Sequence, residues 1–531
     1  MRGLRVALVE CGDFAGATSS RSSKLIHGGL RYLPQREFRL VRDSLAERER
    51  LRHLTAPHLV KPLRFLFPLY RDRGPGRLQL GVGLWLYDFF ARIPRTERHQ
   101  RLNRAATLAA EPMVRSEGLT GGASYYDAEG DDARLTLENA LDAAFHGAAI
   151  ANYVGLEGFS RSGARITAAD VRDRLGSAAF ELRARVFVNA AGPWLDDVRR
   201  LDDPGAAPSI RLTKGVHLIF DRARLPVREA LVLSDGVGRI VFVIPYGDYV
   251  LAGTTDTDFD GERASVAADE ADVAYLLGVL EQNLQGNRLG TADVAASFAG
   301  LRALSAAGDG RAPSSVSREE VIVESASGLI SVAGGKLTTH REIAERILDR
   351  VAVVIGRGIG NSRTLDTPLP GARPLPDEEL AAINTNRAGV VADRADGANA
   401  LGALPEDLRA AMLARYGTRA AIAARIALES PELARPLTAG CAVAAAEVAF
   451  AIRYEMAVSV ADFIVRRTAL SWRDPGRARA AAAAAARMMA IEYGWDRERE
   501  QAEIAACNLP GAESPATSAT VGSRSEAKRD D

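Results

Sequence analysis

Short apolar segments that alternate with helical segments constrain the fold of this chain more than any other feature of its sequence. Residues 4–9 (LRVALV) and 185–189 (RVFVN) are predicted to be short buried strands, whereas residues 37–54 and 134–150 show apolar residues at helical spacing. Strands separated by glycine turns are predicted throughout residues 210–252. This order predicts an α/β nucleotide-binding core with an inserted antiparallel cap.

Further predicted elements extend this scheme along the chain. Strands are predicted at residues 154–159, 166–171, 180–182, 320–323 and 329–332, and helices at residues 269–284 and 337–355. A chain of 531 residues needs several domains, because one domain usually holds roughly 100–200 residues. Beyond Pro368 the patterns become helical with few strand signals, and a polar tail that we expect to be disordered ends the chain. The predicted limits are 1–60, 125–200 and 325–360 for the core, 61–124 and 201–324 for the cap, 361–510 for a C-terminal helical domain, and 511–531 for the tail.

Charge and cysteine content exclude several classes of protein. The formal net charge is +0 and no basic face with interleaved aromatic residues is found, so we expect no nucleic-acid partner. Cys11, Cys441 and Cys507 lie far apart without the spacing of metal ligands, which argues against a disulfide scaffold or a metal site and for a reducing compartment. No transmembrane helix and no signal peptide are predicted.

Peripheral contact with a membrane stays open because of one helical segment. Residues 77–92 place Leu84, Trp85, Leu86, Phe89 and Phe90 between arginines, as an interfacial helix does. A buried helix of the cap explains the same pattern equally well.

Residues 18–33 (TSSRSSKLIHGGLRYL) carry the densest chemical signal. Serine hydroxyls and exposed backbone N–H groups in such a loop suit a phosphate or pyrophosphate. The glycine pair Gly28-Gly29 allows close approach of a flat ligand, and Arg31 offers a bidentate fork to an anion. A solvated serine-rich turn is the structural alternative.

A second glycine pair, in residues 333–340 (AGGKLTTH), is predicted to follow a strand and open a helix. Such a nest of N–H donors, with Lys336 beside it, stabilises negative charge on a reduced flavin. Glu10 ends the first strand, where dinucleotide-binding folds place an acidic residue that binds ribose. The small residues of VNAAGPW (188–194) allow a cofactor to approach a strand end closely.

Taken together, these motifs resemble the FAD-dependent glycerol-3-phosphate dehydrogenase family. The resemblance extends from residue 1 to about Asn508 and rests on motifs that occur in the family's order. They are ATSSRSSKLIHGGLRYL, EFRLVRDSLAERE, APHLVKPLRF, DDARLTLENA, VNAAGPW, RLTKGVH, RIVFVIPY, GTTD and GGKLTTHR. The resemblance implies an FAD domain, a substrate cap and a helical C-terminal domain. It also implies oxidation of sn-glycerol 3-phosphate to dihydroxyacetone phosphate, with electrons passed through FAD to a membrane quinone.

The resemblance also implies site residues. Substrate and phosphate contacts fall on Arg31, Tyr32, Arg302 and Arg318, and the bordering motifs add His27, Lys214, His217 and Lys336. Flavin contacts fall on Glu10, Ser19, Ser20, Ser22, Lys24, Gly192, Gly335, Lys336, Leu337 and Thr338. The family implies a cytoplasmic protein, peripheral on the inner face of the membrane, and leaves a homodimer open.

Residue chemistry restricts the catalytic step without deciding it. Oxidation of a secondary alcohol requires a base or a polarising donor at its hydroxyl, and His217, Lys336 and Arg302 are the candidates. A histidine accepts a proton near neutral pH, whereas an arginine stabilises developing alkoxide charge.

One departure from the family pattern concerns the beginning of the chain. The family opens with a strand followed by GxGxxG, and no such motif follows a strand near Met1. We expect either that the protein begins upstream of this sequence or that the chain binds FAD poorly and purifies with little flavin. We also expect an unpaired edge on the strand at residues 4–9, where a neighbour would be missing.

Three other functions remain open at this point. A glycerol-3-phosphate oxidase shares the motifs and passes electrons to oxygen. A flavin-free remnant acting as a binding protein agrees with the missing glycine-rich turn but not with the retained arginines. An amino-acid oxidase fits less well, because an amine substrate does not need several arginines and a lysine for phosphate.

Overall fold

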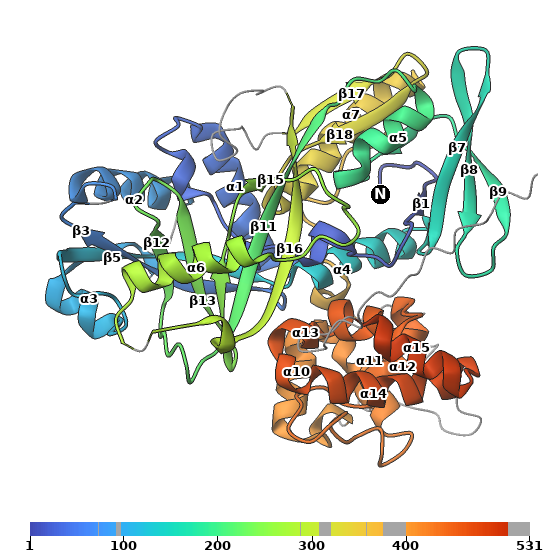
Figure 1. Ribbon diagram of the computed structural model, residues 1–531. Helices are drawn as coiled ribbons and strands as arrows, with labels where there is room; N and C mark the ends of the chain where they lie inside the picture. Colours follow the sequence, from blue (N-terminus) through green and yellow to red (C-terminus); the bar gives the residue numbers. More distant parts are fainter. Residues whose placement is uncertain are drawn as a thin grey trace, which may run out of the picture.

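The fold is described by a computed structural model, which covers residues 1–72, 74–91, 97–286, 288–306, 320–356, 358–374 and 400–507. A large sheet with helices against it lies beside a smaller strand-and-helix unit, and a group of C-terminal helices lies below both (Figure 1). The family-like α/β core, strand-rich cap and helical C-terminal part predicted above are therefore all present. The predicted tail lies outside the described residues.

The large sheet dominates the cap. Its strands follow the order β15-β11-β14-β13-β12-β3-β5-β2, with β16 also paired to β11 and β4 to β5. The strands are β2 (Leu25–Ile26), β3 (Val60–Tyr70), β4 (Gln100–Asn103), β5 (Leu119–Gly130), β11 (Ile210–Asp221), β12 (Ala230–Ser234), β13 (Ile240–Tyr246), β14 (Tyr249–Gly253), β15 (Thr257–Asp258) and β16 (Val294–Ser305). The meander predicted at residues 210–252 is confirmed as β11 to β14.

The long antiparallel pair β3 and β5 was not predicted as strands. Val60 lies opposite Gly130 and Tyr70 opposite Leu119, with one irregularity near the end of the ladder. The sequence of β5 has no regular alternation of apolar and polar residues, because β5 is buried along most of both faces. The predicted domain limit between residues 124 and 125 falls inside β5, so that this strand carries residues of both predicted domains.

The core contains two small sheets. Strand β1 (Ala7–Val9) pairs in parallel with β6 (Ala149–Ala151), and β10 (Phe187–Asn189) pairs in parallel with β18 (Leu329–Ala333), which is antiparallel to β17 (Val321–Glu324). Strand β1 pairs only with β6 among the described residues, which agrees with the expected unpaired edge.

Burial of the first strand differs from the prediction. Residues 4–9 were predicted to be buried, yet Val6 is 51% exposed and Leu8 is 41% exposed. Val188 on β10, also predicted to be buried, is 45% exposed. Among the described residues β1 pairs with β6 alone and otherwise contacts β7, which leaves Val6 and Leu8 partly uncovered.

The remaining elements flank these sheets. A three-stranded antiparallel sheet, β7-β8-β9, stands at one end of the molecule (Figure 1). It consists of β7 (Val154–Ser162), β8 (Arg165–Asp173) and β9 (Ala179–Arg183). The helices of this part are α1 (Phe38–Arg50), α2 (Arg77–Ala91), α3 (Arg104–Ala110), α4 (Asp132–Phe145), α5 (Leu195–Asp202), α6 (Glu270–Asn283) and α7 (His340–Ile355). Short turns used below are η1 (Ala17–Ser20), η2 (Leu30–Tyr32), η5 (Gly192–Trp194) and η8 (Leu337–Thr339).

The C-terminal part is helical, as predicted. Its helices are α10 (Glu406–Tyr416), α11 (Ala420–Ala427), α12 (Ala446–Glu455), the π-helix η11 (Asp462–Arg467), α13 (Leu470–Arg473), α14 (Pro475–Tyr493) and α15 (Arg497–Ala506). The alanine-rich helix α14 buries Ala478, Ala481, Ala482, Ala485 and Ala486 in the core of this part. Small side chains permit the close helix packing that a bulkier face would prevent.

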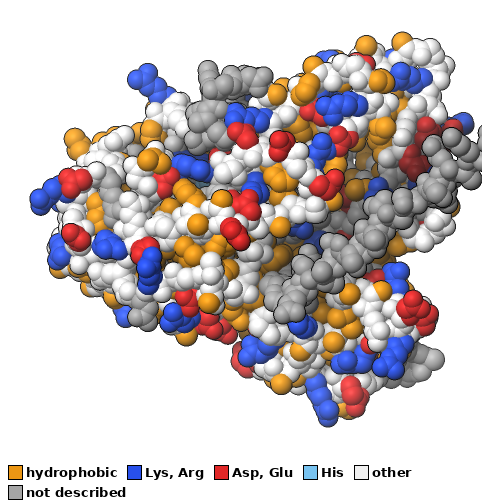
Figure 2. Space-filling model, in the orientation of Figure 1, with side chains coloured by type: hydrophobic (Ala, Val, Ile, Leu, Met, Phe, Trp, Pro, Cys, Tyr) orange, Lys and Arg blue, Asp and Glu red, His pale blue; other side chains and the backbone are white. Residues whose placement is uncertain are grey.

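Two surface observations complete the description. On the face shown in Figure 2, positive and negative side chains are interspersed and no large patch of one sign forms. Among the described residues, no helix is long and apolar enough to cross a membrane.

Candidate active site

Strands β11 and β16 place two of the predicted catalytic residues on one face of the large sheet. Thr213 lies directly opposite Arg302, and His217 lies directly opposite Phe298. Because side chains alternate along a strand and paired residues share a face, His217 and Arg302 point to the same side of the sheet. The RLTKGVH motif and residues 300–302 thus meet through strand pairing.

Lys214 points to the opposite face. It is paired with Leu301, and its ammonium forms ion pairs with Asp269 at 2.5 Å and with Asp272 at 2.6 Å, at the beginning of α6. Burial lowers the pKa of Lys214, but hydrogen bonds and charge from the two carboxylates raise it above its usual value overall. The structure therefore does not bring Lys214 together with His217 and Arg302.

Arg302 is held by the polar turn that follows β14. Its Nη2 donates to Thr254 Oγ1 at 3.0 Å, and its Nη1 donates to the carbonyl of Thr255 and to Asp256 Oδ1, both at 3.2 Å. A Cβ atom on Gly215 would lie 2.4 Å from this guanidinium, so the glycine makes room for it. The GTTD motif thus fixes the direction of the arginine fork.

His217 is buried between the sheet and the serine-rich segment. The residue is 2% exposed, and its ring stacks on Phe298 with centroids 4.8 Å apart. The distance from Nε2 to Ser23 Oγ is 2.8 Å, and Nδ1 has no hydrogen-bond partner among the described residues. Burial, followed by the charges of Arg302 and Lys24, holds the pKa of His217 well below its usual value. The ring is therefore neutral at physiological pH.

A second group of predicted residues meets around the ring of Tyr32. The Lys336 ammonium lies 4.0 Å from the ring centroid and the Arg31 guanidinium carbon 4.9 Å from it. Arg31 Nη2 also donates to Tyr32 Oη at 2.8 Å, and Lys336 Nζ lies 3.4 Å from Ser44 Oγ. Two cations on one aromatic ring create a local positive field suited to an anionic ligand.

The glycine pair of the serine-rich segment is held by buried groups beneath it. The backbone N–H of Gly28 donates to Tyr87 Oη at 2.9 Å and to Asp127 Oδ1 at 3.2 Å. Asp127 is in turn paired with Arg48 at 2.7 Å. His27, next to this pair, accepts a hydrogen bond on its carbonyl from Thr338 Oγ1 at 3.5 Å, which links η8 to the segment.

The serine-rich segment is anchored to the beginning of α4. Lys24 Nζ donates to Asp132 Oδ1 and to the carbonyl of Ser20, both at 2.5 Å. The backbone N–H of Ser22 donates to Asp132 Oδ2 at 3.0 Å. Lys24, predicted as a flavin contact, is thus buried in an ion pair that shapes the loop, whereas Ser19 is exposed.

Two of the predicted flavin contacts, Gly192 and Gly335, follow the ends of neighbouring strands. Asn189 of β10 pairs with Ser331 of β18, and because the strands are parallel, Gly192 and Gly335 follow at the same edge of the sheet. Strand β16 lies against η1, η5 and β18, and Thr18 Oγ1 donates to its Leu301 carbonyl at 2.6 Å. Glu10 stands at the end of β1, where its Oε1 accepts from the backbone N–H of Gly12 at 3.0 Å.

The residues at these strand ends fit a bound FAD. A Cβ atom on Gly192 would meet no atom within 4 Å, which leaves the side of this turn open to a ligand. Gly334 and Gly335 adopt φ values of 77° and 89° before η8, a conformation that exposes backbone N–H groups. Gly192 and Gly335 therefore lie at one end of the β10–β18 pair, whereas Glu10 follows β1 in the separate β1–β6 sheet. Arg318 lies outside the described residues.

Comparison with known proteins identifies the family. Residues 1–341 match the family model described as FAD dependent oxidoreductase, and residues 362–500 match the C-terminal domain of alpha-glycerophosphate oxidase. Glycerol-3-phosphate dehydrogenase 2 of Mycobacterium tuberculosis is 37% identical over 508 residues, which cover 95% of this chain and 84% of the relative. The chain belongs to the glycerol-3-phosphate dehydrogenase family.

Further relatives agree with this assignment. The aerobic glycerol-3-phosphate dehydrogenase of Staphylococcus aureus is 34% identical over 475 residues, covering 88% of this chain and 83% of the relative. The structure of the glycerol-3-phosphate dehydrogenase from Bacillus halodurans complexed with FAD superposes with a TM-score of 0.74 at 30% identity, covering 95% of this chain and 89% of that one. The predictions of family, fold and FAD as cofactor are confirmed, and the protein is an FAD-dependent oxidoreductase.

Sequence reasoning missed several residues that support the site. Ser23 contacts His217, and Ser44 contacts Lys336. Ser23 lies inside the serine-rich segment. Its neighbours Ser22 and Lys24 were predicted as flavin contacts, whereas Ser23 was not predicted as a site residue. The GTTD motif contributed to the family resemblance, yet nothing in the sequence shows that it binds Arg302. Ser44 is hidden in a helical pattern, and only the tertiary fold brings it to Lys336.

Proposed function

We propose that the protein oxidises sn-glycerol 3-phosphate to dihydroxyacetone phosphate and passes the electrons to a membrane quinone. FAD, when bound, accepts the hydride that leaves C2 of the substrate. The observation that carries the proposal is the pair formed by a neutral, buried His217 and the oriented fork of Arg302 on one face of the sheet. Family membership supplies the substrate class.

Different residues of the chain bind the substrate phosphate, stabilise charge and accept the proton. Arg31 and Lys336 attract the phosphate dianion, and Arg302 stabilises negative charge that develops on the substrate oxygen. His217 accepts the hydroxyl proton. Because the ring is only 2% exposed, we propose that the Ser23 hydroxyl, which lies 2.8 Å from Nε2, transmits this proton from the substrate to the ring.

The electron acceptor is tested by measuring products. Purified enzyme with FAD is given sn-glycerol 3-phosphate and either a water-soluble quinone or dissolved oxygen alone. We expect rapid turnover with the quinone and little hydrogen peroxide with oxygen. Hydrogen peroxide formed in step with substrate loss would instead identify a glycerol-3-phosphate oxidase.

The exposed face of α2 supports contact with a lipid surface. Leu78, Val82, Trp85 and Phe89 are 75%, 51%, 59% and 65% exposed, and their spacing places them in one row along the helix. The rings of Trp85 and Phe89 stack with centroids 5.9 Å apart. The opposite face buries Leu84 and Tyr87, so α2 is anchored to the cap while its apolar row faces outward.

We propose that this row inserts into the interface of a lipid bilayer, where a quinone acceptor is dissolved. The double variant Trp85→Ser and Phe89→Ser is expected to abolish most co-sedimentation with liposomes that contain anionic lipid. The matched control is Val237→Ser with Ile491→Ser, two apolar side chains that are 87% and 84% exposed elsewhere. Equal binding of the wild type and the α2 variant would contradict docking through α2.

A further inference from the structure

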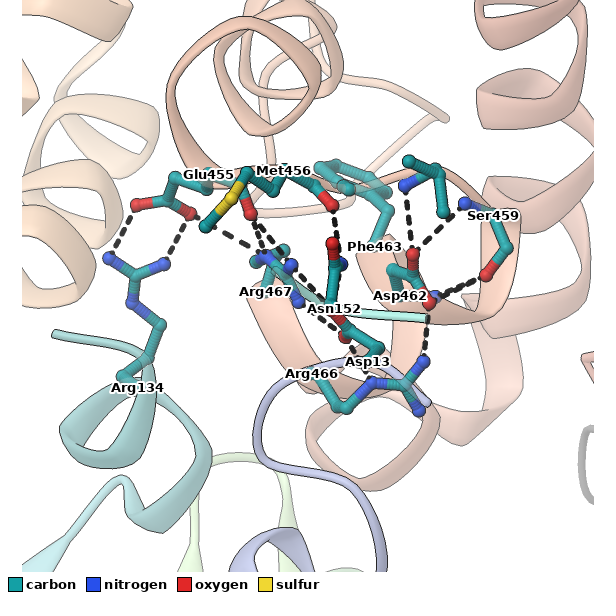
Figure 3. A network of polar contacts seen from close by, with 12 residues as sticks. Asp13, Arg134, Asn152, Glu455, Met456, Ser459, Asp462, Phe463, Arg466 and Arg467 are labelled. Atoms are coloured by element: carbon teal, nitrogen blue, oxygen red, sulfur yellow. Dashed lines mark hydrogen bonds and ion pairs between the residues drawn. The ribbon is translucent and has the colours of Figure 1, made fainter. Parts of the chain in front are cut away.

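Buried charged side chains connect the C-terminal helices to the segment between β1 and β2 (Figure 3). Arg467 of η11 donates to both oxygens of Asp13, at 2.6 Å and 2.8 Å, and Arg466 Nε donates to Oδ2 at 2.5 Å. Asn152 Nδ2 adds a bond to Oδ1 at 3.2 Å. The side chains of Asp13 and Arg467 are both 0% exposed. Burial alone would raise the pKa of Asp13, but the Arg467 and Arg466 charges lower it below its usual value, so the carboxylate is ionised.

The same network reaches α4 through Glu455. Arg467 Nη2 donates to the Glu455 carbonyl at 2.7 Å, and the Glu455 carboxylate accepts two bonds from Arg134 of α4, at 2.5 Å and 2.9 Å. Arg419 adds a third bond at 2.9 Å. Figure 3 shows the Arg134 fork facing the Glu455 carboxylate and the Arg467 fork by the Glu455 backbone carbonyl. The end of α12 is therefore bonded directly to α4 and, through Arg467, to Asp13.

The two contacts hold residues 13–24, which include the first part of the serine-rich segment, at both ends. Asp13 lies four residues before Ala17, where η1 begins. Arg134 lies two residues after Asp132, whose carboxylate binds the backbone N–H of Ser22 and the ammonium of Lys24. Residues 13–24, which carry four of the predicted flavin contacts, are thus fixed to the C-terminal helices at one end directly and at the other through α4.

The chemistry of the network suits positioning better than stabilisation. Removing charges from water costs free energy that their mutual attraction often only offsets, so buried ion pairs contribute little net stability. Paired arginine forks nevertheless fix the relative position and direction of the groups they join. Four donors on the Asp13 carboxylate leave it no other arrangement.

We propose that the C-terminal helical domain positions the serine-rich segment for FAD, with Asp13 and Arg467 as positioning residues. This inference rests on the proposed assignment of that segment to FAD. Loss of either residue leaves every flavin contact in the chain but lets the segment that carries four of them move. The domain therefore contributes to cofactor affinity without touching the cofactor.

The test uses the full chain, stripped of flavin and titrated with FAD while flavin fluorescence is recorded. Arg467→Met is expected to raise the dissociation constant of FAD by roughly tenfold or more. The kcat and KM for sn-glycerol 3-phosphate at saturating FAD are expected to stay unchanged. Amide hydrogen exchange of residues 13–24 is expected to accelerate in the same variant. Asp13→Asn, which keeps the size of the side chain, gives the same comparison if Arg467→Met does not fold.

The matched control is Arg415→Met. Arg415 forms a buried ion pair with Glu447 entirely within the C-terminal helices. It is expected to lower the Tm while leaving the dissociation constant of FAD unchanged. Equal weakening of FAD by both arginine variants would show a general loss of stability and overturn the proposal, as would unchanged FAD affinity in Arg467→Met and Asp13→Asn.

A third variant separates this inference from the assignment on which it rests. Ser19→Asp places a negative charge on the exposed part of η1 and is expected to weaken FAD strongly. If Ser19→Asp has no effect, the segment does not bind FAD and the assignment fails. If Ser19→Asp weakens FAD but Arg467→Met and Asp13→Asn do not, only the positioning role is wrong.

Discussion

Replacing His217 with glutamine is expected to lower kcat by about 10²-fold or more, the usual contribution of a positioned general base. Glutamine retains a polar side chain of similar length but cannot accept a proton. The Ser23 hydroxyl would then have no base at 2.8 Å to receive its proton. The measurement is steady-state kinetics with a quinone at saturating FAD, with flavin content and Tm recorded for each variant.

The matched control for this prediction is His58→Gln. His58 is also largely buried and bonds a carboxylate, with Nε2 2.9 Å from Glu138, but it lies away from the sheet face that carries Arg302. We expect it to change Tm more than kcat. A His217→Gln enzyme with nearly normal kcat would exclude the ring as the proton acceptor and leave Lys336 as the candidate base.

The pH dependence of kcat follows from the imidazole ring of His217. Its pKa lies well below 6.5, because burial and the neighbouring charges disfavour the protonated form. The active, neutral ring is lost only as the pH falls through this depressed pKa, so kcat is expected to stay constant as the pH is lowered to 6.5 and to fall only well below it. An acid limb of kcat at or above pH 6.5 that disappears in His217→Gln would contradict the assigned protonation state.

Replacing Arg302 with alanine is expected to lower kcat/KM by about 10²- to 10³-fold, as the loss of a preorganised donor to a developing oxyanion does. The structure holds this fork with Thr254, the Thr255 carbonyl and Asp256. The loss should appear in kcat, because the developing charge exists only in the transition state, while the flavin content stays unchanged. Arg302→Lys should recover part of the loss, because a point charge replaces the fork without its two-pronged geometry.

The control for Arg302→Ala is Arg224→Ala. Arg224 belongs to the same cap but forms an exposed ion pair with Asp293 at 2.7 Å. Surface pairs of this kind contribute little to stability, so we expect neither kinetics nor Tm to change appreciably. Unchanged kcat and kcat/KM in Arg302→Ala would remove this residue from the site.

Much of the fold was predictable because local patterns agree with it. Apolar spacing located α1, α4, α6 and the β11–β14 meander, since each buries one face against the sheet or within it. The β3 and β5 strands were missed because β5 is buried on both sides and lacks alternation. The burial of β1 was predicted wrongly, because a run of apolar residues does not reveal whether other elements pack against the strand.

The sequence predicted candidate site residues but not the contacts that they make. His217 and Arg302 were identified from motifs, and strand register then placed them on one face. Lys214, three residues before His217, was included for the same motif, although strand alternation turns it toward Asp269 and Asp272. Lys24 was predicted to touch flavin, yet its ammonium is bonded to Asp132 and the Ser20 carbonyl, partners that only the tertiary fold supplies.

The most direct test of the central claim is the visible absorbance spectrum of the purified chain with added FAD, recorded without oxygen before and after sn-glycerol 3-phosphate is added. The account predicts that bound flavin bands appear with FAD and bleach with the substrate, and that they do not bleach with glycerol, which lacks the phosphate. Bound flavin that stays oxidised in the presence of sn-glycerol 3-phosphate would contradict the proposed reaction.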